Sequence, residues 1–292
     1  MTVINTNVAA TITANALTKN ERAMSQAMER LSTGQRINSA GDDAAGLAIS
    51  SRMTTYIKGL DMAVRNANDA ISMIQTADGA LIEMTNMLQR MRELAVQASS
   101  GTYSATDRDA LNVEFEALTA AVEDIADDTQ WNGVSLLNGA SAFSFHVGAN
   151  ASQTISLTIA DFETEESSMT SGIFEALADA TTNNDNSGDD LDSLDVDTVS
   201  NAGTALTYIT TALGRIESHR ATLGATINRL EYAADNLANV SQNTLASRSR
   251  VLDADYASET TELARTQIIQ QAATAMLSQA NQQAQSVLAL LK

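Results

Sequence analysis

The chain of 292 residues contains no cysteine and no proline, and it has only two histidines. Without cysteine there are no disulfides and no thiol nucleophiles. The absence of proline is typical of long uninterrupted helices, because proline breaks the helical hydrogen-bond ladder. His146 and His219 lie far apart in the sequence, and no zinc-binding, nucleophile-elbow or phosphate-loop motif is present. We therefore predict no catalytic site, metal site or cofactor.

Basic residues are missing from the whole middle of the chain. Between Arg108 and Arg215 there is no lysine or arginine, whereas this interval carries 19 Asp and Glu. The other 17 acidic residues are balanced by 17 basic ones, so the ends are neutral and the middle repels its copies. No basic cluster is available to neutralise phosphates, which argues against nucleic acid as a partner.

Long apolar runs are also absent. No stretch reaches the eighteen or so consecutive apolar residues of a membrane-spanning helix, so we predict no membrane insertion. The N-terminus lacks the basic, apolar and small-residue pattern of a cleaved secretion signal. We expect either a cytoplasmic protein or one that is exported by a route without a cleaved signal.

The strongest pattern is a heptad repeat between residues 49 and 95. Starting from Ile49, alternate steps of four and three residues reach an apolar residue every time. A stripe of period 3.5 predicts a helix that packs against other helices of similar length, here a rod of about 70 Å. The stripe consists of Ile49, Met53, Tyr56, Leu60, Ala63, Ala67, Ala70, Ile74, Ala77, Leu81, Met84, Leu88, Met91 and Ala95.

Four further stretches have helical periodicity. A weak pattern lies within residues 1–37, a second helix follows the Ser104 and Thr106 capping signals and ends at Asp128, and a second heptad run spans residues 206–237. The last stretch, residues 263–291, has few charges on its outer face. Its predicted seam contains Ile268, Ile269, Ala272, Met276, Ala280, Val287 and Leu291.

The period changes to two after Thr129. Alternating residues from Phe143 to Val147 and from Ile155 to Ile159, with Asn-Gly turn signals before them, predict a small antiparallel hairpin region. Residues 161–200 are poor in apolar side chains, and we predict a surface insertion with one short helix at residues 173–177.

Several segments resemble bacterial flagellin. The resemblance includes both ends of the chain and covers roughly residues 1–160 and 200–292. It is carried by VINTN at 3–7, LSTGQRINSAGDDAAGL at 31–47, LQRMRELAVQ at 88–97, TQWNG at 129–133, SRSRVLDADY at 247–256 and the close at 288–292.

The resemblance implies a mainly α fold, in which long antiparallel heptad-patterned helices form a coiled-coil bundle with a small β-hairpin region. Residues 1–44 with 255–292 would form a terminal helical pair that lines the filament. Residues 45–160 with 201–254 would form the long-helix bundle and hairpins, and residues 161–200 a short acidic variable insertion on the outer surface. The outer domains of the family would then be nearly absent.

The resemblance also implies partners and contact residues. Arg90, Leu94 and Glu114 match flagellin positions that bind the vertebrate Toll-like innate receptor, and Gln97 lies on the same face, which packs between protofilaments. From the sequence alone, Leu94 could instead widen the core against the second helix. Other implied partners are the export chaperone at the C-terminal segment and the hook-associated and cap proteins.

The terminal segments are only weakly amphipathic and carry few charges. We predict that they are disordered in the monomer and become ordered when neighbouring chains cover their apolar seams; a pair already docked within the monomer is the alternative. The residues predicted to make this inner core are Val8, Ile12, Leu31, Ile268, Ala272, Met276, Val287 and Leu291.

The function expected from the residues and the resemblance is a structural subunit that self-assembles into the extracellular flagellar filament after type III export. Two alternatives remain. A hook–filament junction protein shares the terminal pattern but assembles as a small ring. A secreted helical adhesin or binding module would use the acidic hairpin region, and would leave the neutral C-terminal helix unexplained.

Overall fold

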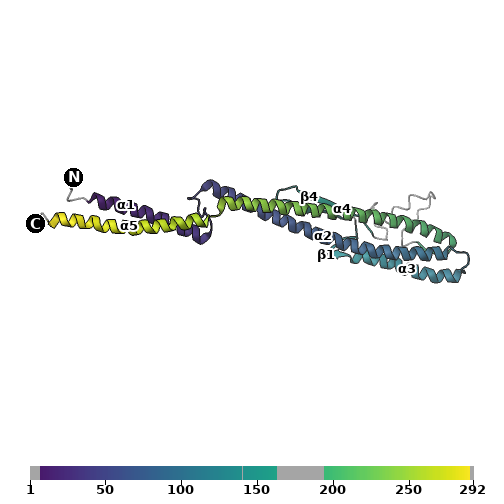
Figure 1. The fold of residues 1–292 in the computed structure, drawn as a ribbon. Helices are drawn as coiled ribbons and strands as arrows, with labels where there is room; N and C mark the ends of the chain where they lie inside the picture. Colours follow the sequence, from purple (N-terminus) through teal and green to yellow (C-terminus); the bar gives the residue numbers. More distant parts are fainter. Residues whose placement is uncertain (1–6, 140, 163–193, 290–292) are drawn as a thin grey trace. The chain divides into compact units, whose positions relative to one another are not determined.

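The computed structural model describes residues 7–139, 141–162 and 194–289 (Figure 1). The short helix predicted at 173–177, and most of the insertion at 161–200, lie outside the described residues. The elements are α1 (Val8–Thr33), α2 (Ala44–Ala98), α3 (Ala105–Asp128), β1 (Gln130–Trp131), β2 (Val134–Ser135), β3 (Ser141–His146), β4 (Thr154–Ile159), α4 (Val199–Leu252) and α5 (Tyr256–Ala289). This confirms the predicted mainly α fold with a hairpin in the middle.

The helix ends are set by local hydrogen bonds. Gly34 closes α1 in the left-handed conformation, at φ +71°. Before α2, the Asp43 carboxylate accepts a hydrogen bond from the Gly46 amide at 2.9 Å. Ser104 and Asp107 form the capping box of α3, one of the two pairs that the sequence offered.

The chain divides into two compact units. Unit 1 comprises residues 1–57 and 242–292, and unit 2 comprises residues 58–241. Both long helices, α2 and α4, contribute to both units, so each unit is described separately below.

Unit 2 is built on the stripe of α2. Every residue of the predicted apolar stripe from Leu60 to Ala95 is buried. α4 contributes Ile209, Ile216, Leu223 and Leu230 to the same core, and α3 contributes Phe115 and Val122. The three helices run side by side in unit 2 (Figure 1), as the two heptad runs predict.

The hairpins add a small β layer to this core. β1 and β2 meet at a tight turn in which Asn132 and Gly133 both have positive φ, as the Asn-Gly signal predicts. In the β3–β4 pair, Phe143 lies opposite Leu157, and the Phe143 and Phe145 rings stack with centroids 6.4 Å apart. The pair is joined to α2 by the Asn66 amide, which donates to the His146 carbonyl at 3.2 Å.

In unit 1, α1 and α5 lie side by side and antiparallel, with their free ends together (Figure 1). Their contact combines half-buried leucines, such as Leu17 and Leu263, with small and polar side chains. The Asn20 amide donates to the carbonyl of Thr266 at 2.8 Å, and Asn20, Ala27 and Thr266 are buried. At the other end of the pair, Arg30 and Glu259 form an ion pair at 3.0 Å.

Within one chain, α1 packs against a different side of α5 from most of the predicted seam. The buried or half-buried residues between 256 and 282 are Glu259, Glu262, Leu263, Thr266, Gln270, Ala273, Leu277 and Ala280. Of the predicted seam, Ala280 lies on this inner side, whereas Ile268, Ile269, Ala272 and Met276 are exposed. At Thr266 the two helices are close enough for the Asn20 side chain to reach a backbone carbonyl.

Candidate functional site: assembly surfaces of the helices

Unit 1 presents large apolar side chains to solvent on both terminal helices. Ile12, Ile268 and Met276 are 64%, 66% and 60% exposed. We call the exposed residues Ile268, Ile269, Ala272 and Met276 of α5 the outward row. An apolar row on a charge-poor helix is typical of a surface that another protein covers.

The other predicted inner-core residues are distributed differently. Val8 is exposed beside Ile12 on α1, whereas Leu31 is half-buried near the end of that helix. Val287 belongs to α5, and Leu291 lies outside the described residues. Exposure of Val8, Ile12 and the outward row leaves these residues available to neighbouring chains.

The predicted contact residues of the long helices form a polar cluster over one core residue. Arg90 on α2 donates from Nε to Glu114 on α3 at 2.8 Å and from Nη1 to Glu93 at 3.0 Å. The hydrogen bond that Arg90 donates to Glu114 is the main cause that raises the pKa of Arg90. Gln97 is exposed on the same helix. Leu94, in contrast, is 1% exposed, which is the packing role that the sequence left open.

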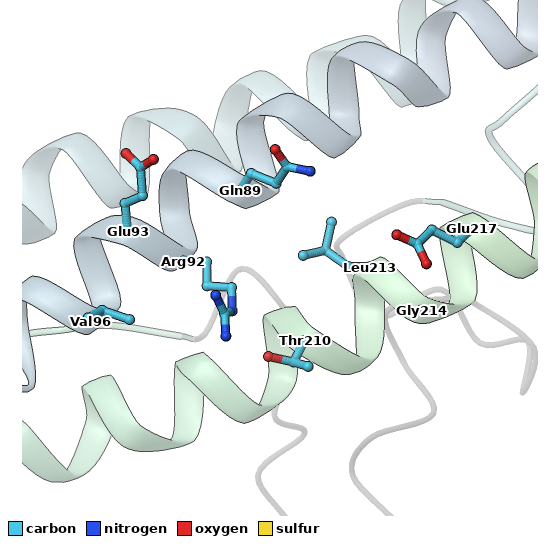
Figure 2. Close-up of a pocket in the computed structure, with 8 residues that line it drawn as sticks. All are labelled: Gln89, Arg92, Glu93, Val96, Thr210, Leu213, Gly214 and Glu217. Atoms are coloured by element: carbon cyan, nitrogen blue, oxygen red, sulfur yellow. The ribbon is translucent and has the colours of Figure 1, made fainter.

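A groove lies between α2 and α4 in unit 2, with a volume of about 710 Å³. Figure 2 shows Arg92 of α2 and Leu213 of α4 pointing into the groove, while Glu93 points away from it. Val96 is exposed on its wall, and Gly214 leaves its floor open. The heptad pattern does not predict this groove, although the apolar Val96 outside the stripe is a signal for it. Its mixed lining of one arginine, two glutamates and apolar side chains suits protein contact.

The two histidines lie apart from these surfaces. His146 ends β3, and His219 on α4 packs against the ring of Phe162, with centroids 5.4 Å apart. Burial lowers the pKa of His219. In the part of the chain that the structure describes, no helix is long and apolar enough to cross a membrane, and no three His, Asp or Glu side chains are placed to hold a metal ion.

Two family models match the chain. The bacterial flagellin N-terminal helical region matches residues 4–142, and the bacterial flagellin C-terminal helical region matches residues 206–291. The first match ends within β3, and the second begins near the start of α4. The matches therefore cover most of the helical residues and leave residues 143–205 outside.

Relatives match over nearly their full length. The flagellin of Bacillus subtilis (strain 168) is 42% identical, covering 99% of this chain and 99% of that protein. The flagellin of Halalkalibacterium halodurans is 46% identical over 91% of both. A putative flagellar hook-associated protein from Vibrio parahaemolyticus has a similar fold, with a TM-score of 0.57 over 73% of this chain, at only 11% identity.

The fold is thus shared with a hook-associated protein, whereas the sequence agrees with flagellins. Flagellins are structural proteins that polymerise into the flagellar filament. The two family matches and the full-length relatives together show that this chain belongs to the bacterial flagellin family.

Proposed function

We propose that this protein is a filament subunit whose copies join mainly through unit 1, with the outward row of α5 and the exposed apolar residues of α1 as the adhesive surface. The observation that carries the proposal is the reversed burial in the α1–α5 pair. The pair buries Ala27 and Thr266 and exposes Ile12, Ile268 and Met276. Association of many copies would remove these side chains from water.

The distribution of charge also favours association through unit 1. Unit 1 has nine basic and eight acidic residues, a net charge of +1, whereas unit 2 has eight basic and 28 acidic residues, a net charge of −20. Bringing copies of unit 1 together therefore costs little electrostatic repulsion. The acidic unit 2 keeps filaments soluble and is best placed towards solvent.

The partners follow from the same surface. Before assembly, an exposed outward row needs protection, and we propose that an export chaperone covers α5 until the subunit leaves the cell. Hook-associated and cap proteins would meet the same terminal helices at the two ends of an extracellular filament. A hook–filament junction protein remains the second candidate because the fold is shared with a hook-associated protein.

The test is electron microscopy of purified subunits before and after addition of ammonium sulfate, which strengthens apolar burial and screens the acidic unit. We expect long uniform filaments. Met276→Asp should prevent their formation, whereas Gln271→Asp, which adds the same charge on an exposed polar position of α5, should allow it. Short closed rings of the wild-type protein would favour a junction protein, and persistent monomers would favour an adhesin.

We also propose that the Arg90, Gln97 and Glu114 face binds the vertebrate Toll-like innate receptor. These three side chains are exposed, and the Arg90–Glu114 ion pair holds a fixed polar surface above Leu94. Arg90→Asp should abolish signalling in a receptor reporter assay. Arg229→Asp, on an exposed position of α4, is the matched charge reversal. Unchanged signalling by Arg90→Asp would refute the receptor role.

A further inference from the structure

The first turns of α2 carry an apolar groove within unit 1. It has a volume of about 410 Å³ and is lined by Ile49, Arg52, Met53 and Tyr56 of α2 and Thr244 of α4. We call it the α2 groove. Ile49 and Tyr56 are 39% and 38% exposed, and Leu245, the neighbour of Thr244, is 40% exposed.

The α2 groove interrupts the burial of the heptad stripe. Ile49, Met53 and Tyr56 are the first three residues of the heptad stripe. The buried residues here are instead Ser50, one residue after Ile49, and Ile57, one residue after Tyr56. In these turns the buried side of the helix therefore does not coincide with the stripe: Ile49 and Tyr56 are exposed and Met53 is half-buried.

The charge of unit 1 restricts what could cover this groove. The acidic unit 2 of another copy would bring a net charge of −20 to the contact, whereas unit 1 of another copy brings +1. Burial of apolar side chains against the neutral unit meets the smaller electrostatic opposition. Arg52 is the charged residue of the lining.

Within unit 1, the outward row of α5 has the matching spacing. Ile269 and Met276 are seven residues apart, as are Ile49 and Tyr56, so that each pair spans about 10.5 Å along its helix. Rows of equal period can interdigitate as knobs and holes. On α1 the large exposed residues Val8, Ile12 and Met28 do not repeat at seven. The opposite side of α5 is already used by α1 of the same chain, which leaves the row free for a second copy.

We propose that the α2 groove receives the outward row of α5 from a second copy of the chain. The interface is heterologous: groove and row are different surfaces, so each copy offers one of each, and the contact can be repeated from copy to copy along a filament. The proposal rests on the proposed filament function and adds to it a specific pair of surfaces.

The absence of cysteine provides a clean test. Two single variants, Met53→Cys in the groove and Met276→Cys in the row, carry different tags, are mixed, assembled into filaments and oxidised. We expect a disulfide-linked heterodimer several-fold above that formed by Met53→Cys with Tyr232→Cys. Tyr232 is the matched partner because it is exposed on α4 in unit 2. Heterodimer yields that are equal for the two mixtures would overturn the proposal.

Alkylation of the single variant Thr244→Cys provides a second measurement if Met276→Cys hinders assembly. Its thiol should react about tenfold or more slowly in filaments than in monomers, because a covered thiol reacts only through local opening. Reactivity should return after the filaments are dissolved. Filaments that form normally but leave this thiol fully reactive would refute the interface alone, whereas failure of the wild-type protein to form filaments would refute the proposed function.

Discussion

Arg220 on α4 and Asp78 on α2 are 142 residues apart in sequence, and their side chains meet at 2.7 Å between Nε and Oδ1. Arg220 occupies the one position of the 206–237 heptad run that is not apolar. Its hydrogen bond to Asp78 is the main cause that raises the pKa of Arg220. The two side chains are 33% and 32% exposed. The ion pair therefore replaces an apolar contact at the partly exposed edge of the α2–α4 seam.

A double-mutant cycle measures this pair. Arg220→Ala and Asp78→Ala should show a coupling energy of about 0.5–1 kcal/mol in urea unfolding, the range for partly exposed ion pairs. The coupling should shrink in 1 M salt, as screening predicts with a Debye length of about 3 Å there. Additive single-variant effects at low salt would show that the two charges do not interact.

His219 gives unit 2 a dependence on pH. Burial lowers its pKa in the folded state, and among the described residues its Nε2 has no hydrogen-bond partner. The unfolded chain therefore takes up a proton first as the pH falls below about 6.5, which is the pKa of an unperturbed histidine. The free energy of unfolding should be constant above that pH and decrease below it.

Urea unfolding of the wild-type protein and of His219→Gln between pH 8 and pH 5 checks this prediction. The variant should lose the part of the decrease that begins near the unperturbed histidine pKa. His146→Gln, at the end of β3, is the control for replacing a histidine elsewhere. Parallel pH curves for the wild-type protein and His219→Gln would contradict the assignment.

The capping box of α3 should contribute measurably to stability. The Ser104 hydroxyl accepts from the Asp107 amide at 3.3 Å, and the Asp107 carboxylate accepts from the Ser104 amide at 3.0 Å. Ser104→Ala should reduce the free energy of unfolding by about 1 kcal/mol. Thr106→Ala alters the other Ser/Thr-x-x-Asp pair and should cost less than Ser104→Ala in the same denaturation experiment, because the structure uses only the Ser104 box.

The contacts of Ser104 lower the pKa of Asp107, its side-chain hydrogen bond being the largest cause. Because the folded pKa is lower than the unfolded one, this stabilisation is present above the unfolded pKa of about 3.9 and is lost as the pH falls through the folded pKa. The difference between the wild-type protein and Ser104→Ala should therefore be largest near neutral pH.

Two glycines of α2 should respond in opposite directions to substitution. A Cβ at Gly59 would lie 3.1 Å from Cβ of Ala149 in the β3–β4 turn, whereas a Cβ at Gly79 would meet nothing within 4 Å. Gly59→Leu should push the turn away and cost about 1–3 kcal/mol. Gly79→Ala should stabilise the helix by about 0.5–1 kcal/mol. Thermal unfolding of both variants shows directly whether each substitution raises or lowers the stability of the protein.

Amide exchange decides between the ordered and disordered terminal helices in the free subunit. The sequence predicts disorder of α1 and α5 before assembly, and in their contact only Asn20, Ala27 and Thr266 are buried among the described side chains. We expect rapid exchange in α1 and α5 of the monomer and strong protection in filaments. Strong protection at residues 263–289 in the monomer would show that the pair is already stable there.

Local rules in the sequence determine most of the secondary structure. The heptads of residues 49–95 and 206–237 lie within α2 and α4, the Asn132–Gly133 turn occurs where its signal stands, and Ser104 and Asp128 mark the ends of α3 as predicted. These features depend on neighbouring residues and on the allowed backbone angles, both of which can be read from the chain. Membership of the flagellin family rests on the same residues.

Only the tertiary structure decided which faces meet. In α5 the side that faces α1 carries Leu263, Thr266 and Leu277, whereas Ile268 and Met276 of the predicted seam remain exposed within one chain. Likewise, the stripe of α2 predicted burial of Ile49 and Tyr56, which are exposed in the structure, and Leu94 proved to be a core residue. The sequence fixes the period of a helix, whereas its rotation about its own axis is set by side chains that are distant in the chain.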